Sequence, residues 1–529
     1  MSGAGKAMLL VAGTVLLTSC ASVGPQPAPL DLLIVGGTVI DGTGATARRL
    51  DVGISGERIA FLGDAGRERR AARRTIDARG LLVTPGLIDP HTHSADDLSA
   101  GDAGRRAALN HLMQGVTTVF VGNDGSGSLG QMDALARSGG TGVNVASFIG
   151  FGSVRREVLG DNGRAPTTAE LERMKTLVAR GMCAGALGFS AGLYYAPQSF
   201  AKTDEVVALA REAASRGGLY ETHLRDEGSD NIGLEAAVGE AIAIGRSAGL
   251  AVHIAHIKAL GVDAHGKAPA VIRQIEAAQA SGVRVTADQY PWTASGTRIT
   301  SALVPRWALE GGRSELATRL ADPALQGRLR SAMSDNLRRR GGAGSLLIIG
   351  GKQRGRRLDA VAAEWKVDPV SAAVRILQEE GDAPVASFNM IAADIDAFAR
   401  QPWVVGSSDA VDGHPRKFGS FALRWQQFVA ERKMLSPEVF VNRTSGLTAS
   451  IFGLPARGTI AIGNAADVIA FDPRHYAARA TYDEPEALAT GVSTVVVNGK
   501  LAVDGGQPTG ALAGQFLRKP RRADWACPV

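Results

Sequence analysis

The sequence predicts an α/β protein, a (β/α)₈ TIM-like barrel with a small β-sandwich domain built from both chain ends. Three observations carry this prediction. Short apolar segments alternate with longer helical stretches over residues 85–455, the pattern of βα units and a parallel sheet. Two β-rich segments of similar style flank this region, over residues 31–84 and 456–529. The chain has 529 residues, and one domain typically takes roughly 100–200, so there is room for two.

The chain begins with features of an export signal. Lys6 supplies positive charge, and residues 8–17 are apolar but too short to span a bilayer as a stable helix. The run that ends at Cys20 resembles a bacterial lipoprotein cleavage box, and the next residue is not the Asp that retains lipoproteins at the inner membrane. We therefore expect a signal peptide over residues 1–19, a tether over residues 20–30 and an exported lipoprotein.

Lipid chains on Cys20 would anchor the protein in a membrane. The expected location is the outer membrane, facing the periplasm. With Cys20 acylated, only Cys183 and Cys527 remain, too few for a disulfide framework.

Eight apolar segments are the predicted barrel strands: Leu87–His93, Val116–Asp124, Asn144–Phe148, Ala186–Ser190, Leu219–His223, Ala251–His256, Val283–Asp288 and Trp403–Asp409. In such a barrel the chemistry lies at the C-terminal ends of the strands. The interval over about residues 305–401 is too long for one connection, and we interpret it as an inserted subdomain.

Histidines and one aspartate stand at the ends of predicted strands. His91 and His93 are two residues apart, so their side chains point to the same face of a strand. His223 ends the fifth segment, His256 the sixth, and Asp409 the eighth. Neutral imidazoles and a carboxylate that meet at a barrel mouth are suitable ligands for Zn²⁺ or a similar divalent ion.

One histidine competes for the sixth-strand role. His253 and His256 are three residues apart, so on a strand they face opposite sides. We assign the metal to His256, at the strand end, and expect His253 to pack in the core or to support a ligand.

Several motifs resemble those of known proteins. Residues 84–93, which read Thr-Pro-Gly-Leu-Ile-Asp-Pro-His-Thr-His, look like the signature of the amidohydrolase superfamily. Residues 185–193, 222–227, 255–258 and 414–416 resemble the D-aminoacylase (N-acyl-D-amino-acid deacylase) family. The resemblance implies hydrolysis of the amide bond of N-acyl-D-amino acids. It also implies site roles: His91, His93, His223 and His256 as metal ligands, and Asp409 as the catalytic acid/base.

The second strand departs from the family pattern. The family usually has Gly-Asn-Cys-Gly there, with the cysteine binding metal, whereas residues 122–125 read Gly-Asn-Asp-Gly. A carboxylate from Asp124 can replace the thiolate, but it is a harder ligand and less selective for zinc. The alternative is that Asp124 is only a turn residue. The sequence therefore leaves open whether the site holds one Zn²⁺ ion, two Zn²⁺ ions or another divalent metal.

The resemblance also implies how a small-molecule N-acyl amino acid is bound. Lys258 and Arg416, helped by Tyr195 and Tyr290, would hold its free carboxylate, and a guanidinium suits a carboxylate in a bidentate pair. Selectivity for D-amino acids follows from the resemblance alone.

Three alternative functions differ in how well they fit this pattern. A metallo-dipeptidase acting on dipeptides with a D-residue fits the same site. A cyclic-amide hydrolase usually carries a carboxylated lysine on the fourth strand, and residues 186–190 contain none. A lipoprotein that only binds ligands has no need for Asp409 as an acid/base. The net charge of +6 is small for this length and no nucleic-acid-binding motif is visible, so we expect no nucleic-acid partner.

Overall fold

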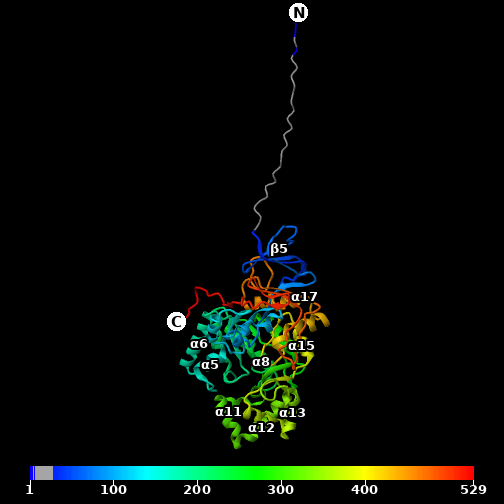
Figure 1. The fold of residues 1–529 in the computed structure, drawn as a ribbon. Helices are drawn as coiled ribbons and strands as arrows, with labels where there is room; N and C mark the ends of the chain where they lie inside the picture. The colour runs from blue at the N-terminus through cyan, green and yellow to red at the C-terminus, as the bar shows by residue number, and fades with distance from the viewer. Residues whose placement is uncertain (4, 6–27, 529) are drawn as a thin grey trace.

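The computed structural model describes residues 1–3, 5 and 28–528; Cys20 and most of the predicted signal peptide lie outside this range. The β-sandwich lies at one end of the molecule, the barrel in the middle, and a helical subdomain at the other end (Figure 1). No helix among the described residues has both the length and the apolar character needed to cross a membrane.

The centre of the molecule is a closed barrel of parallel strands. Its strands are β8 (Leu87–Asp89), β9 (Val116–Val121), β10 (Asn144–Ser147) continued by β11 (Ile149–Gly150), β12 (Gly188–Gly192), β13 (Leu219–His223), β14 (Val252–Ile254), β15 (Val285–Gln289) and β19 (Val404–Gly406). A bridge between Thr92 and Ala410 joins the ends of the first and last strands. The predicted fold class is therefore confirmed.

Helices cover the outside of the barrel, and most follow a strand directly. They are α1 (Ala95–Leu98), α2 (Ala103–Arg106), α3 (Leu109–Leu112), α4 (Leu129–Ala136), α5 (Phe151–Leu159), α6 (Thr168–Cys183), η1 (Gln198–Phe200), α7 (Thr203–Ala214), α8 (Leu234–Ala248), α9 (Ala268–Ala280), α15 (Ala392–Ala399), α16 (Arg416–Arg424), η4 (Trp425–Glu431), α17 (Pro437–Thr444) and α18 (Gly446–Phe452). Helix α6 begins with a capping box between Thr167 and Glu170, which satisfies two backbone N–H groups at its start. Helix α8 ends at Gly249, which is in the left-handed conformation.

The sandwich is made from both ends of the chain. One sheet contains β1 (Leu30–Val35), β4 (Asp51–Ser55), β5 (Arg58–Gly63) and β6 (Ala72–Asp77). The other contains β2 (Thr38–Val39), β3 (Arg48–Arg49), β7 (Leu82–Pro85), β20 (Val468–Phe471), β21 (Val492–Val497), β22 (Lys500–Asp504) and β23 (Gln507–Pro508). The two chain ends meet where β20 pairs antiparallel with β7.

An inserted subdomain follows β15. It contains a sheet of β16 (Ala294–Arg298), β17 (Leu346–Ile348) and β18 (Pro384–Phe388), with α10 (Ile299–Leu303), η2 (Arg306–Leu309), α11 (Gly312–Ala321), α12 (Pro323–Arg339), η3 (Ala343–Ser345), α13 (Leu358–Trp365) and α14 (Pro369–Glu379). It has a hydrophobic core of its own. Its bounds differ from the expected 305–401: it begins at β16, and α15, expected inside it, packs against α9 of the barrel.

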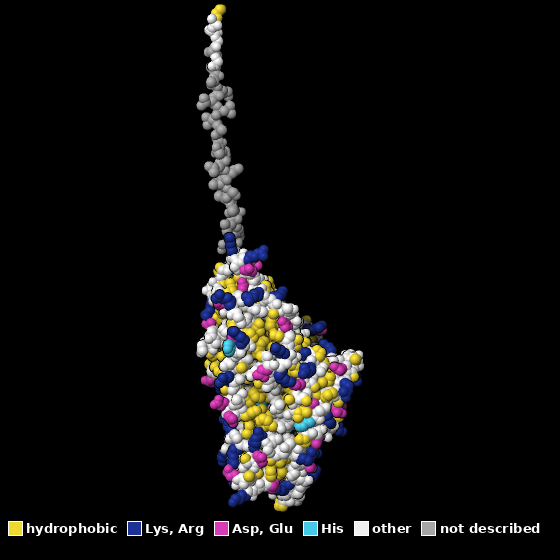
Figure 2. Space-filling view, turned by 90° about the vertical axis from the view of Figure 1, so that its right-hand side faces the viewer, with side chains coloured by type: hydrophobic (Ala, Val, Ile, Leu, Met, Phe, Trp, Pro, Cys, Tyr) yellow, Lys and Arg dark blue, Asp and Glu magenta, His cyan; other side chains and the backbone are white. Residues whose placement is uncertain are grey.

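The surface carries mixed charge. On the face shown in Figure 2, lysine and arginine side chains alternate with aspartate and glutamate rather than gathering in one basic field. This agrees with the small net charge of +6.

A disulfide ties the C-terminal tail to the barrel. Cys183, the last residue of α6, is bonded to Cys527, 344 residues later, with their Cα atoms 5.9 Å apart. The tail also adds β24 (Phe516–Leu517) in parallel beside β10, and Arg216 Nη2 donates a hydrogen bond to the Ala526 carbonyl at 2.6 Å. The two cysteines are too few for a disulfide framework, as expected, but they form this single bond, which the sequence pattern does not predict.

Loss of this disulfide is expected to destabilise the fold without altering the site. Cys527→Ser should lower the free energy of unfolding by about 2–4 kcal/mol, because the bond restricts the unfolded chain. Thermal unfolding with and without reductant measures this, and reductant should not lower the Tm of the Cys183→Ser/Cys527→Ser variant. A wild-type Tm unchanged by reductant would contradict the prediction.

Candidate metal centre and active site

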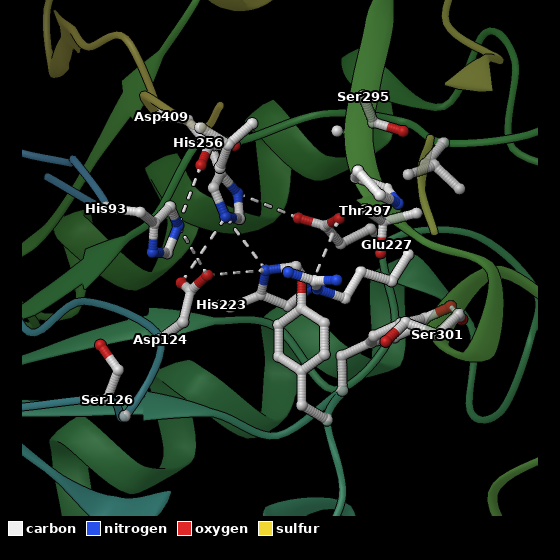
Figure 3. A pocket seen from close by; sticks show the side chains of 18 of the residues that line it. His93, Asp124, Ser126, His223, Glu227, His256, Ser295, Thr297, Ser301 and Asp409 are labelled. Carbon is white, nitrogen blue, oxygen red and sulfur yellow. Dashed lines mark hydrogen bonds and ion pairs between the residues drawn. The ribbon is translucent and has the colours of Figure 1, made fainter. Parts of the chain in front are cut away.

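The predicted metal ligands meet at the C-terminal mouth of the barrel, and Figure 3 shows His93, Asp124, His223 and His256 there together with Asp409. His91 and His93 follow β8, Asp124 follows β9, His223 is the last residue of β13, His256 follows β14 and Asp409 follows β19. Donor atoms fall within 4.8 Å of one another in three overlapping groups: His91, His93 and Asp124; His91, His256 and Asp409; and Asp124, His223 and His256. All six residues that the sequence singled out are therefore brought together.

Asp124 lies at the centre of this group. Its Oδ1 atom is 3.6 Å from His91 Nε2 and 3.7 Å from His256 Nε2. Its Oδ2 atom is 3.5 Å from His93 Nε2 and 3.9 Å from His223 Nδ1. One carboxylate thus faces all four imidazoles, a position suited to bridging two cations.

Several donor atoms in this group have no hydrogen-bond partner. They are His91 Nε2, His223 Nε2 and Asp124 Oδ1, all buried. Because a buried polar atom without a partner is costly, native structures seldom leave several together. A mixture of imidazole nitrogens and carboxylate oxygens with atoms left unpartnered fits a divalent cation such as Zn²⁺.

Three of the ligand candidates have a strained backbone. Asp124, His256 and Asp409 have φ of +55°, +33° and +48°. Non-glycine residues seldom adopt the left-handed region, and such strain is concentrated at functional sites. The strained turns are held in place by neighbouring strands.

Hydrogen bonds from other elements hold these turns. Asp89, at the end of β8, accepts from the Ser408 backbone N–H at 3.0 Å and from its hydroxyl at 2.5 Å, which fixes the residue before Asp409. Gln198 Nε2 donates to the Asp124 carbonyl at 2.9 Å. Gly125 has φ of +76°, and a Cβ atom there would lie 2.2 Å from Gln198 Oε1, so glycine avoids both backbone strain and displacement of Gln198.

Two buried carboxylates behind the histidines were not predicted. Glu221 Oε1 is 3.3 Å from His91 Nδ1. Asp288 Oδ1 accepts from the His256 backbone N–H at 2.9 Å, and its Oδ2 lies 3.0 Å from His253 Nε2. Glu221 stands two residues before His223 on one strand, so the period of two could have revealed it. Such carboxylates orient the imidazoles of metal ligands, and His253 belongs to this supporting layer.

Five of the six residues, all except the fully buried His91, line a cavity of about 520 Å³ that the inserted subdomain also lines. All four predicted substrate-binding side chains, Lys258, Arg416, Tyr195 and Tyr290, line it. Arg416 Nη2 forms an ion pair with Asp409 Oδ2 at 2.8 Å, while its Nε and Nη1 atoms have no hydrogen-bond partner. Arg416 can therefore hold Asp409 and still donate to a substrate.

Lys258 is already engaged with site residues. Its Nζ atom is 2.5 Å from Glu227 Oε1 and 2.7 Å from His256 Nδ1. Glu227 is not among the predicted site residues, although it ends the family-like run 222–227. The hydroxyl of Tyr290 has no partner, and its ring centroid lies 4.9 Å from Arg416 Cζ.

The charge of Asp409 is set by its neighbours. Burial raises the pKa of Asp409, but Arg416 and His256 outweigh it and hold the pKa well below the ordinary range. The carboxylate is therefore ionised at neutral pH, the state that can accept a proton.

Comparison with known proteins identifies the family. The profile described as the Amidohydrolase family matches residues 74–296. An N-acyl-D-glutamate deacylase of Alcaligenes xylosoxydans xylosoxydans is 34% identical over 519 residues, covering 93% of this chain and 97% of that protein. A D-aminoacylase of the same organism is 32% identical, covering 93% and 98%. The chain belongs to the D-aminoacylase family of amidohydrolases.

A solved structure agrees with this membership. The N-acyl-D-glutamate deacylase from Bordetella bronchiseptica, complexed with zinc and a phosphonate inhibitor that mimics the tetrahedral intermediate, has a TM-score of 0.80 and 31% identity. The match covers 93% of this chain and 100% of the Bordetella bronchiseptica protein. A structure of D-hydantoinase, at 19% identity and a TM-score of 0.56, shares the fold. The fourth strand, β12, reads Gly-Phe-Ser-Ala-Gly and offers no lysine for the ligand expected of a cyclic-amide hydrolase.

Proposed function

We propose that this protein hydrolyses the amide bond of N-acyl-D-amino acids, releasing a carboxylic acid and a D-amino acid, with a divalent metal bound by the cluster around Asp124. The observation that carries the proposal is the ionised Asp409 beside this cluster, paired with Arg416, which lines the cavity and has two nitrogens without a hydrogen-bond partner. The relatives with deacylase activity in their names support the same reaction.

The site residues divide the chemistry between them. His91, His93, Asp124, His223 and His256 would hold the metal, which when bound lowers the pKa of water and polarises the amide carbonyl. Asp409 takes the proton of the attacking water and returns it to the leaving amine. The ion pair with Arg416 holds Asp409 Oδ2, and this leaves Oδ1, 3.2 Å from His93 Nε2, directed at the centre of the site. General base and then general acid catalysis of this kind typically contributes about 10²–10⁴-fold.

The substrate carboxylate would be bound by Arg416 and Tyr290. The guanidinium has two donors to spare and the phenol hydroxyl has one. Lys258 would add positive charge nearby while it remains bonded to Glu227. The carboxylate fixes the orientation of the substrate at its α-carbon, where the two enantiomers differ.

The test is amine release from N-acetyl-D- and N-acetyl-L-amino acids by metal-reconstituted protein that lacks its first twenty residues. We expect release from the D-series alone, abolished by a chelator and restored by Zn²⁺. Release from dipeptides ending in a D-residue, with none from the N-acetyl series, would favour the metallo-dipeptidase. No release from either series, with bound metal confirmed, would contradict the proposal.

Metal binding is expected to release protons and to strengthen as the pH rises. Burial lowers the pKa of His91, but Asp124 and Glu221 outweigh it and raise the pKa to about 10. Burial and Lys258 lower the pKa of His256, but Asp409 and other carboxylates raise it to about 9. His223 is held neutral, since burial lowers its pKa to about 4.

Two imidazoles therefore carry protons near neutral pH in the metal-free protein, and a metal must displace both. Calorimetry in buffers of different ionisation enthalpy should find about two protons released per site at pH 7, because ligands must be deprotonated to bind. Affinity should fall as the pH drops below 7. Binding independent of pH between 6 and 8 would contradict this.

We further propose that the protein is an exported lipoprotein, acylated at Cys20 and held at the outer membrane facing the periplasm. The cleavage-box resemblance before Cys20 supports this, and the Cys183–Cys527 disulfide suits an oxidising compartment. Labelling of expressing cells with a radioactive fatty acid tests it: wild-type protein should be labelled and Cys20→Ala should not. Label retained by Cys20→Ala would place the acyl chain elsewhere.

A further inference from the structure

Arg340 of the inserted subdomain lines the catalytic cavity with a donor left free. It follows α12 directly and is 2% exposed. Its Nε atom donates to the Ala302 carbonyl at 3.0 Å, and its Nη2 atom donates to the Tyr194 hydroxyl at 2.8 Å. Its Nη1 atom is buried without a hydrogen-bond partner.

The charge of Arg340 also lacks a direct counter-ion. Lys258 and Arg416, the other buried cations of the cavity, are paired with Glu227 and Asp409. Among the described residues, no carboxylate oxygen lies within 4.0 Å of the Arg340 guanidinium. A buried cation with an unused donor is costly unless something pairs with it. Asp230 lines the same cavity and helps to raise the pKa of Arg340 through its negative charge, but the two side chains form no ion pair.

Arg340 is close to the metal cluster. Tyr194, whose hydroxyl it binds, lies between them, with its ring centroid 5.5 Å from that of His223. Arg306 stacks on the same ring, its Cζ atom 3.7 Å from the ring centroid, and further fixes the tyrosine. A group bound at Arg340 therefore sits one tyrosine side chain away from the metal ligands.

This position is distinct from the place of the substrate α-carboxylate. Arg416 belongs to α16 and packs against Tyr290, whereas Arg340 follows α12 and bonds to Tyr194 in the segment after β12. A substrate whose α-carboxylate is held by Arg416 would need a second anionic group to reach Arg340.

We propose that Arg340 forms a second anion subsite, which binds a carboxylate on the substrate remote from the scissile amide. The preferred substrates are then N-acyl-D-amino acids with two carboxylates. The second carboxylate belongs either to the side chain of the amino acid or to a dicarboxylic acyl group. This inference rests on the proposed deacylase function and narrows its substrate class.

The experiment compares each acidic substrate with its neutral amide. One series pairs N-acetyl-D-glutamate with N-acetyl-D-glutamine, and N-acetyl-D-aspartate with N-acetyl-D-asparagine. The other pairs N-succinyl-D-leucine with its succinamoyl analogue. In one of the two series, wild-type kcat/KM should favour the acid on the order of tenfold to a hundredfold, as a charge-assisted hydrogen bond allows. The series that shows the preference identifies the source of the carboxylate.

Arg340→Met should bring that ratio close to one, because the charged contact with the second carboxylate is lost. The variant also loses the hydrogen bonds to Ala302 and Tyr194, which affect both members of a pair, so the ratio of acid to amide and not the absolute rate is the readout. The matched control is Arg339→Met, which removes the neighbouring arginine, bonded to Asn336 outside the cavity, and should keep the ratio. Arg340→Lys, which keeps the positive charge, should retain part of the preference for the acid over its amide.

Equal turnover of acid and amide by wild-type protein in both series would overturn the subsite, and so would a preference that survives in Arg340→Met. If the methionine variant fails to fold, Arg340→Lys decides the question: a reduced ratio supports the subsite and an unchanged ratio overturns it. Failure of the proposed function gives a different result, namely no release from any N-acyl-D-amino acid.

Discussion

Asp409→Asn is expected to lower kcat for amide hydrolysis by about 10²–10⁴-fold, because the amide cannot take a proton from water. Asparagine keeps the size of the side chain and tolerates the φ of +48° at this position. The four histidines and Asp124 remain to hold metal, so the metal content measured by atomic emission should stay close to that of wild type. A loss of rate without a loss of metal assigns the acid/base role to this carboxylate.

Asp412→Asn is the matched control. Asp412 lines the rim of the same cavity, but its side chain is 87% exposed and pairs with Lys417. Its substitution removes one negative charge near the site and should leave kcat within about twofold, since exposed ion pairs contribute little. Hydrolysis by Asp409→Asn at the wild-type rate would refute the mechanism given above.

The sequence predicted the fold because the barrel strands carry a local signal. Each is a short apolar run, and the predicted Leu219–His223 coincides with β13. Where that signal fails, the prediction fails too. Strand β16 consists of small and polar residues, Ala-Ser-Gly-Thr-Arg, so the inserted subdomain starts earlier than the sequence suggested. The disulfide joins residues 344 apart, and its formation depends on the path of the tail, which no local pattern records.

The residues of the site at strand ends were predictable from the sequence, whereas the contacts between them were not. His91 and His93, at a spacing of two, and Asp409, at a strand end, could be placed because a parallel barrel brings strand ends to one mouth. The ion pairs of the site could not be predicted. Lys258 with Glu227 and Arg416 with Asp409 each join residues of different strands and loops, and no local pattern records such contacts. Arg340 lies in an Arg-rich stretch, and only its tertiary contact with Tyr194 and its burial in the cavity wall distinguish it from the exposed Arg338.

Asp124→Asn is expected to lower both the metal content and kcat/KM. The carboxylate lies within 4 Å of a nitrogen of each of the four histidines, so its charge acts on every imidazole of the cluster. Loss of a direct ligand should cost at least the roughly 10–100-fold in metal affinity that follows loss of an outer-shell partner. Asparagine also tolerates a φ of +55°, so the variant preserves the turn while it removes the anionic ligand.

Asp124→Cys then separates the two interpretations of this residue. A thiolate is a softer ligand than a carboxylate, so the variant should bind Zn²⁺ well and discriminate more strongly against Mn²⁺ than wild type does. If Asp124 is a metal ligand, Asp124→Cys reconstituted with zinc keeps metal and activity, whereas Asp124→Asn loses both. If Asp124 serves only the turn, Asp124→Asn should retain full metal content and rate. In that case cysteine, which fits the left-handed turn less well, should be the more damaging substitution.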